Sequence, residues 1–382
     1  MQILSLNFLL YTITGLWRPI EWSSKCFKSL YSVYTFLTMY LFTYFLLTHL
    51  MYIIFVVDNV EDLASCCSIF LGTITLFCKA TIVIIRRDKI INLIEILQEE
   101  PCKACNEEEI NIQMKFDRLI RLYSMPYIIL YIISAICTVI GGILYMLDGQ
   151  IPYGFVWVPW ECTSFLLFCL TSLQEMVAVF IGIIVNAATE TTVLGFCLQI
   201  CARFEILNYR LQSMIKDEKE TMRKSLLNNT SRLSKHVSFH LCIIRLAEMI
   251  NDVFSQVIFI QFFISILVLC SSIYYLSSHI TVTDVFNFTI YIFCLFMQIF
   301  VYCWAGNEVT LKVVVSVALG EEIYHMDWIL MTKSEQQDLL MIMKRSTKPI
   351  KFSSSFLVTL SLESYSNLLK TSFSAFNLLQ QL

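Results

Sequence analysis

Charged side chains are scarce in this chain: Asp, Glu, Lys and Arg make up 15% of its 382 residues, whereas hydrophobic residues make up 57%. Soluble domains carry roughly 25% charged residues. Glycine and proline are also rare, with 10 and 6 copies. This composition excludes a soluble globular domain, and the mean hydropathy of +0.69 indicates an integral membrane protein whose first partner is the lipid bilayer.

Several chemical signatures are absent as well. No nucleophile–base constellation and no phosphate-binding loop is present, so we expect neither enzymatic activity nor a cofactor, and we expect no nucleic-acid partner. The 15 cysteines form no regular extracellular framework. Cys102 and Cys105 form a lone CxxC, and His236 and His240 have no third ligand, so we expect no metal. The N-terminal stretch lacks a basic residue before Arg18, which favours a retained tail over a signal peptide.

About twenty apolar residues cross a bilayer as a helix. Seven segments meet this length, and the last is the least hydrophobic because it carries polar residues. We therefore predict an all-α fold with seven transmembrane helices. The predicted spans lie near 32–57, 63–85, 123–147, 162–188, 252–277, 285–305 and 352–379.

Lysine and arginine are missing from alternate loops. The segments near 58–62, 148–161 and 278–284 contain none, whereas the other connections and the N-terminal segment hold 25 of the 27. Basic residues stay in the cytosol. The N-terminus is therefore predicted to be cytosolic and the C-terminus extracellular, which argues against a G-protein-coupled receptor. Lys79 lies near the cytosolic end of the second span, where it can snorkel.

The helical pattern continues beyond three of the spans. It extends after the fourth span to about residue 215, resumes from about 219 to 250 before the fifth, and continues after the sixth. A further amphipathic stretch precedes Pro349. These cytosolic extensions, in 189–251 and 306–351, form either a bundle within one subunit or an anchor between subunits.

The last span has one polar face. A polar side chain inside the hydrocarbon faces protein or water rather than lipid. The helix is therefore either buried among its neighbours or lines an aqueous path shared by several copies around an axis. The polar face contains Ser364, Asn367, Thr371, Ser374 and Gln381, with Leu378 and Leu382 near its outer end.

Four motifs resemble those of insect odorant receptors. The run LLMIMKRSTKPIKF (339–352) followed by LSLESYSNLLKTSFSAFNLL (360–379) resembles the C-terminal signature of that family. GLWRP (15–19), PWE (159–161) and YCWAGNEV (302–309) resemble its other motifs. One departure is SSS at 353–355, where the family often has glycine, and this could alter the hinge into the last span.

The resemblance implies a single membrane domain over 1–382 that forms a nonselective cation channel opened by volatile hydrophobic odorants. It implies a heterotetramer with an obligate co-receptor in the plasma membrane of olfactory neurons. The first four spans (32–188) would contribute to the odorant pocket, and 352–382 would line the pore, with a gate at Leu378 and Leu382. A gustatory-type channel of the related group is the alternative.

The family's odorant pocket lies in the outer half of four spans. On the third and sixth spans we take the positions that align with that pocket, and on the second and fourth we choose residues by depth and helix face. These positions are largely apolar and aromatic, as a pocket for hydrophobic ligands requires. The expected odorant-binding residues are Phe70, Leu71, Thr138, Gly141, Tyr145, Phe165, Phe168, Phe288, Tyr291 and Ile292. Ordinary helix packing is the alternative role for each aromatic residue.

Overall fold

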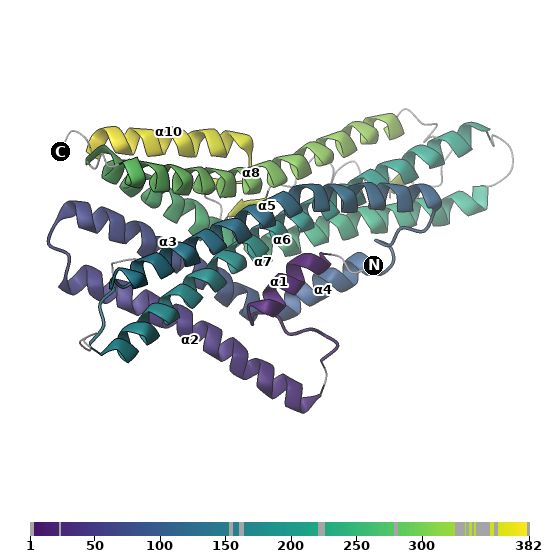
Figure 1. Ribbon diagram of the computed structural model, residues 1–382. Coiled ribbons are helices and arrows are strands. Elements are labelled where there is room, and N and C mark those ends of the chain that lie inside the picture. The colour runs from purple at the N-terminus through teal and green to yellow at the C-terminus, as the bar shows by residue number, and fades with distance from the viewer. Residues whose placement is uncertain are drawn as a thin grey trace.

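The structure is a computed structural model that consists almost entirely of helices (Figure 1). It describes residues 4–22, 24–152, 156–159, 164–220, 226–278, 282–324, 333, 336–337, 340, 352–354 and 358–379. Its elements are α1 (Ser5–Ile13), α2 (Lys25–Phe55), α3 (Val60–Ile85), α4 (Arg87–Gln98), α5 (Glu107–Leu147), α6 (Phe165–Glu220), α7 (Leu226–Ser278), α8 (Val282–Tyr324), β1 (Ser353–Ser354), β2 (Val358–Thr359) and α10 (Leu362–Leu379).

Six helices in the described part of the chain are long and apolar enough to cross a membrane. They are α2, α3, α5, α6, α7 and α8, and they correspond to the first six predicted spans. The predicted seventh span corresponds to α10, which is 18 residues long and polar along one face. The all-helical membrane fold is thus confirmed, whereas composition alone does not identify α10 as a span.

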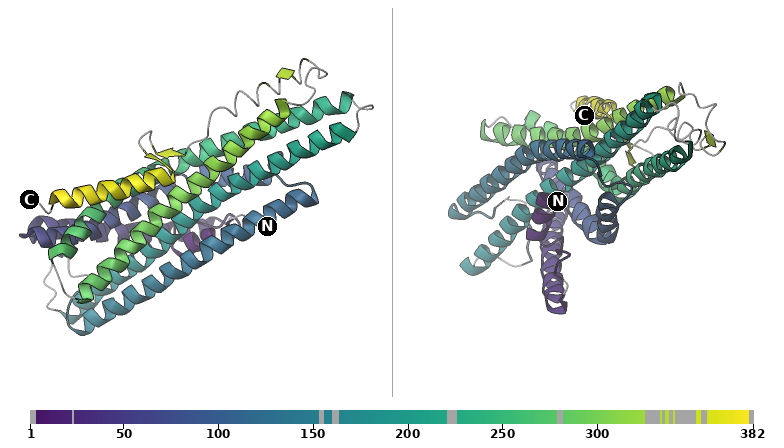
Figure 2. Two further views of the ribbon diagram at one scale, coloured as in Figure 1. Left: turned by 90° about the horizontal axis from the view of Figure 1, so that it is seen from above. Right: turned by 90° about the vertical axis from the view of Figure 1, so that its right-hand side faces the viewer.

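Helix α6 is the centre of the molecule. From Val185 to Leu207 almost every side chain is buried, because α5, α7, α8 and α1 surround this part of the helix. Helices α5 to α8 are 41, 56, 53 and 43 residues long and run side by side (Figures 1 and 2). The predicted continuation of three of these helices beyond the apolar spans is therefore correct. Of the predicted short helix before Pro349, the structure describes only residues 336–337 and 340, which are helical.

The N-terminal segment forms the helix α1, which packs on α6. The side chain of Asn7 donates to Thr191 Oγ1 at 2.8 Å, and Tyr11 is buried. Leu4 packs where Gly195 leaves room: a Cβ at Gly195 would lie 2.2 Å from Leu4 Cδ2. The apolar residues of α1 add to the main core, a packing that the sequence did not predict.

Ion pairs join the extended ends of three helices. Arg210 Nη2 on α6 lies 2.8 Å from Glu109 Oε2 on α5. Glu205 on α6 accepts from Lys115 of α5 at 2.9 Å and from Lys312 of α8 at 2.6 Å. These contacts hold the ends of α5, α6 and α8 together as one bundle within the chain.

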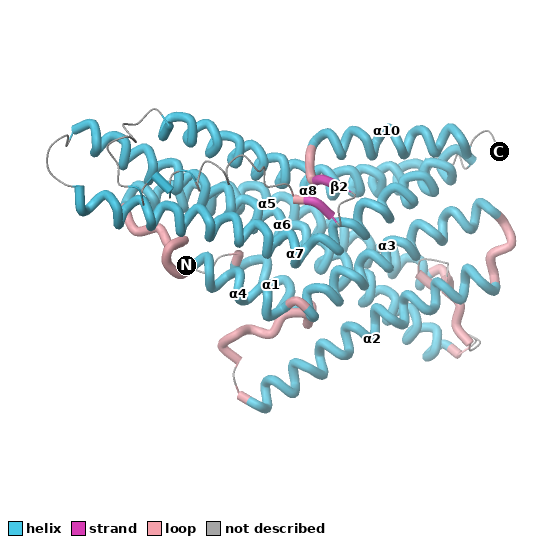
Figure 3. Tube along the Cα trace, turned by 180° about the vertical axis from the view of Figure 1, so that it is seen from behind, coloured by secondary structure: helices cyan, strands magenta, loops and turns pink. Residues whose placement is uncertain are grey.

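A two-stranded antiparallel hairpin leads into α10. Ser353 pairs with Thr359, and Ser354 pairs with Val358. Next to the hairpin, Leu360 lies against α8, where a Cβ at Gly306 would approach the Leu360 carbonyl oxygen to 2.7 Å. Figure 3 shows this hairpin between α8 and the beginning of α10. The segment that we expected to act as a hinge therefore contains regular strand pairing.

Candidate functional site

Most of the predicted polar face of α10 lies on the outside of the chain. Asn367, Thr371 and Ser374 are exposed, whereas Leu368 and Ser372 on the other side of the helix are buried against α7 and α8. The structure therefore rules out, within this single chain, the alternative in which neighbouring helices bury the polar face. Elsewhere the outer surface carries many large apolar side chains, for example Phe36, Leu122 and Ile133.

The exposed groups of α10 differ in how they are satisfied. Thr371 donates to the Asn367 carbonyl oxygen and Ser374 to that of Lys370, each at 2.9 Å, as hydroxyls in membrane helices commonly do. The side-chain amides of Asn367 and Asn377 and the ammonium of Lys370 have no hydrogen-bond partner among the described residues. If α10 crosses a membrane, these three groups need water or a partner chain, since lipid tails offer neither donors nor acceptors.

Ser364 has a different environment from the rest of the polar face. It is half-buried, its backbone N–H donates to Ser361 Oγ at 3.1 Å, and its own hydroxyl lies 3.1 Å from the same atom. Ser361 therefore caps the N-terminus of α10. Ser364 belongs to this cap as well as to the predicted pore lining.

The predicted gate lies at the other end of α10. The helix is described as far as Leu379, and the side chain of Leu378 is not among those described. Gln381 and Leu382 lie outside the described residues. The C-terminal end of α10 is at the end of the bundle where α5 ends and α8 begins (Figures 1 and 2).

The expected odorant-binding residues are found at this same end of the bundle, at the beginning of α3, α6 and α8 and the end of α5. Phe70, Leu71, Thr138, Phe168 and Ile292 are half-buried. Leu71 and Ile292 pack against the main core. Their placement fits either role, ligand contact or ordinary packing.

The remaining odorant-binding candidates differ in how exposed their side chains are. Phe165 and Tyr145 are 81% and 51% exposed, so they lie on the outer surface of the chain. Gly141 adjoins open space, since no atom lies within 4 Å of a Cβ built there. The side chains of Phe288 and Tyr291 lie outside the described ones.

Lys79 does not snorkel to the membrane surface, contrary to the sequence-based expectation. Its side chain is 1% exposed, and Nζ lies 3.0 Å from Oε1 of Glu190 on α6, which is fully buried. Nζ also donates to Asn186 Oδ1 on the same helix. The attraction between opposite charges is strong at low dielectric, and this partner explains why Lys79 points into the bundle.

A chain of hydrogen bonds extends from this ion pair across the bundle. The hydroxyls of Tyr127 and Tyr131 both donate to Glu190 Oε2, that of Tyr131 at 3.5 Å, and the Gln298 amide donates to Tyr131 OH at 2.6 Å. Gln261 then donates to Gln298 Oε1 at 3.1 Å. Polar groups from α3, α5, α6, α7 and α8 are thereby joined; we call this set the central polar network.

Sequence reasoning missed the central polar network, although one signal was present. Lys79 and Glu190 are opposite charges within apolar helical stretches, and such residues commonly pair with one another. The two residues are 111 positions apart, so no local pattern predicts their contact. Glu190 also falls within the predicted cytosolic extension, whereas Lys79 falls within a predicted span.

The two candidate metal motifs have ordinary environments. Cys102 Sγ lies 3.1 Å from Cys242 Sγ rather than beside Cys105, and the hydrogen bond to Cys242, together with burial, raises the pKa of the Cys102 thiol. His240 is buried and His236 is half-buried on α7. No group of three or more His, Cys, Asp or Glu residues suited to a metal occurs in the described part of the chain.

Comparisons with known proteins agree with this architecture. The family model described as 7tm Odorant receptor matches residues 59–373. Odorant receptor 13a of Drosophila melanogaster is 23% identical over 352 residues, which covers 85% of this chain and 82% of that protein. Odorant receptor 10 of Aedes albopictus is 26% identical over 154 residues, 40% of each chain.

A solved structure has the same fold throughout. The insect olfactory receptor OR5 from Machilis hrabei, in complex with eugenol, superposes with a TM-score of 0.80 at 17% sequence identity, covering 99% of this chain and 97% of that chain. At this identity the likeness establishes the fold alone, and the family model establishes the ancestry. This multi-pass membrane protein belongs to the insect odorant receptor family, whose members are receptors and not enzymes.

Proposed function

We propose that the protein is an odorant-gated, nonselective cation channel subunit that works with a co-receptor in a heterotetramer in the plasma membrane of olfactory neurons. The observation that carries this proposal is the exposed polar face of α10, with Asn367, Thr371 and Ser374 on the outside of an apolar bundle. A single chain cannot enclose water against this face. Several copies around an axis can, because closed rotational symmetry brings the same face of each subunit to the centre.

The proposed topology has seven spans, with α10 as the seventh. The distribution of basic residues supports a cytosolic N-terminus and an extracellular C-terminus. In this orientation the extended ends of α5 to α8 lie in the cytosol, as an anchor domain of the ion-paired bundle described above. The acidic outer loops, free of lysine and arginine, would attract cations to the mouth of the pore.

The proposed odorant pocket lies at the outer end of the bundle, near the C-terminal end of α10. The half-buried aromatic side chains of Phe70 and Phe168 support an apolar ligand there. The relative OR5 was solved with eugenol, which is a ligand of this kind. The odorant opens the pore only if it binds the open state more tightly than the closed one. In the open state the α10 helices would separate at Leu378 and Leu382.

The test is the access of water to α10. Asn367→Cys and Thr371→Cys, each co-expressed with an insect co-receptor, are treated with a charged, water-soluble thiol reagent while odorants are applied. We expect a progressive change in current, faster in the presence of odorant. Phe373→Cys is the matched control, because Phe373 is 62% exposed but lies on the apolar side of the helix.

The unsubstituted receptor serves as a second control, since Cys26, Cys105 and Cys137 are exposed. Currents that respond equally to the reagent at positions 367 and 373 would contradict the pore assignment. A gustatory-type channel, the alternative left open by the sequence, is not favoured, because the matching family model is that of odorant receptors.

A further inference from the structure

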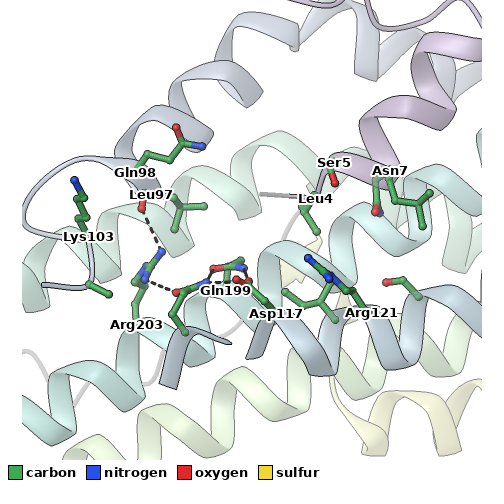
Figure 4. Close-up of a pocket in the computed structure, with 15 residues that line it drawn as sticks. Leu4, Ser5, Asn7, Leu97, Gln98, Lys103, Asp117, Arg121, Gln199 and Arg203 are labelled. Atoms are coloured by element: carbon green, nitrogen blue, oxygen red, sulfur yellow. Dashed lines mark hydrogen bonds between the residues drawn. The ribbon is translucent and has the colours of Figure 1, made fainter. Parts of the chain in front are cut away.

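A polar cavity of about 420 Å³ lies between α1, α4, α5 and α6, near the N-terminus of the described chain. It contains none of the ten expected odorant-binding residues and no residue of α10. Figure 4 shows Lys103 and Arg203 at one end, Asn7 and Arg121 at the other, and Gln199 between them. This cavity is therefore separate from both the proposed odorant pocket and the proposed pore.

Two buried polar groups in the cavity wall have no partner among the described residues. Arg203 is 3% exposed; its Nη1 donates to Gln113 Oε1 at 2.6 Å and its Nη2 to the Leu97 carbonyl oxygen at 3.2 Å, whereas Nε has no acceptor. The hydroxyl of Ser124, a residue 2% exposed, also has no partner. Leaving a buried polar group without a hydrogen-bond partner is unfavourable, so a ligand that bonds to either group would stabilise the protein.

The charge of the lining favours an anion. Arg203, Arg121 and Lys103 contribute three positive charges, against the single carboxylate of Asp117. Asp117 already accepts from the side-chain amides of Gln113 and Gln199, at 2.9 and 2.8 Å. Within the described residues, neither Arg121 nor Lys103 forms an ion pair. The cavity therefore has a surplus of two positive charges.

The position of the cavity relative to the membrane favours a phosphate group over other anions. Arg121 immediately precedes the part of α5 whose apolar side chains face outward, for example Leu122 at 61% and Ile129 at 51% exposed. A basic group at this boundary lies at the level of the phospholipid headgroups. Basic pockets between membrane helices on the cytosolic side bind anionic headgroups, and the guanidinium fork matches phosphate oxygens.

We propose that this cavity binds a phosphate-bearing anion at its Arg121 end: Arg121 attracts it, and Ser124 Oγ is the buried group that it would satisfy. The anion would bridge α1 and α5. Its source is either the headgroup of an anionic phospholipid or a soluble phosphate compound. The inference requires that α5 crosses a membrane, but it does not depend on channel activity.

The test uses the purified full-length protein in phosphatidylcholine nanodiscs, with or without phosphatidic acid, and separately with soluble glycerol phosphate. The thermal unfolding midpoint and the retention of phosphatidic acid in native mass spectrometry are measured. We expect at least one of the two phosphate compounds to raise the midpoint, and the compound that does so identifies the source. If neither compound raises it, the proposal is overturned.

Two charge-matched variants identify the site. Arg121→Gln removes a charge from the cavity, whereas Arg118→Gln removes an exposed charge one turn away on the same helix, outside the cavity. We expect Arg121→Gln, alone or combined with Ser124→Ala, to weaken binding severalfold and Arg118→Gln to leave it unchanged. Equal weakening by both would show a general surface charge effect and overturn the site. Because no current is recorded, failure of the channel proposal would leave this result unaffected.

Discussion

The central polar network and the polar face of α10 are two sets of polar groups on helices of the same chain, and they are satisfied in opposite ways. Lys79 and Glu190 turn inward, are fully buried and bond to each other. Asn367 and Thr371 turn outward on α10 and are exposed. The difference separates the polar groups that stabilise one subunit from those that require water or another subunit.

This comparison links polarity to assembly. A buried ion pair whose partners are all present joins the helices of a single chain, and breaking it harms that chain. An exposed polar face in a hydrophobic environment has no use in the monomer and indicates water or further subunits. Variants of the first set should therefore affect folding, and variants of the second should affect the current at normal levels of folded protein.

The largest effect is expected from breaking the ion pair at one side only. Glu190→Ala leaves the Lys79 ammonium buried without its counter-charge, a loss of about 3–5 kcal/mol. We expect little folded receptor and no current, measured by size-exclusion chromatography and by surface labelling.

The double variant Lys79→Met with Glu190→Met is the control for that experiment. It removes both charges and keeps similar side-chain volume, so much of the folded protein should return. If the single and double variants fold equally poorly, the ion pair is not the reason for the loss.

The next effect is on current alone. Asn367→Leu places an apolar side chain on the polar face, and hydrophobic surfaces in a pore exclude water. We expect most of the odorant-evoked current to be lost while surface expression stays normal. Phe373→Leu, on the apolar side of α10, should leave the current unchanged; a loss of current in both variants would point to packing of the helix instead.

A moderate loss of stability is expected from Gly306→Ala, because the added Cβ would meet the Leu360 Cβ at 2.3 Å and the Leu360 carbonyl oxygen at 2.7 Å. Such overpacking typically costs about 1–3 kcal/mol. The thermal unfolding midpoint in detergent should fall, and Leu360→Ala should not rescue it, because the backbone remains in the way.

Gly195→Ala provides the contrast to Gly306→Ala. There the nearest atom belongs to the flexible Leu4 side chain, so Gly195→Ala combined with Leu4→Ala should unfold at a higher temperature than Gly195→Ala alone. This account of helix contact would be contradicted if the second substitution restored the unfolding midpoint of both glycine variants, or of neither.

The smallest effect is expected at an exposed ion pair. Lys89 Nζ lies 2.6 Å from Asp252 Oδ2, with side chains 56% and 57% exposed. Exposed pairs contribute about 0–1 kcal/mol. Lys89→Met should shift the unfolding midpoint by no more than a degree or two, and a shift as large as that of Glu190→Ala would remove the distinction between buried and exposed charges.

Much of the helical architecture was predictable, because it depends on local patterns. The span lengths, the continuation of α6 past the apolar segment and the polar face of α10 all follow from helical periodicity. The candidate odorant residues were assigned by resemblance on the third and sixth spans and by depth and helix face on the second and fourth, and their roles remain predictions. The helical packing of α1 was not predicted, since its apolar residues find their partners on α6, far along the chain.

Composition and the order of residues were enough to establish a helical membrane protein, the length of its helices and the side of α10 that carries polar groups, because each of these depends on neighbours along the chain. Only the tertiary structure decided that Lys79 meets Glu190, that Asn367 faces outward and that Arg203 lines a cavity. These outcomes depend on which helices pack together, and the free energy of that packing comes from contacts between segments far apart in the sequence.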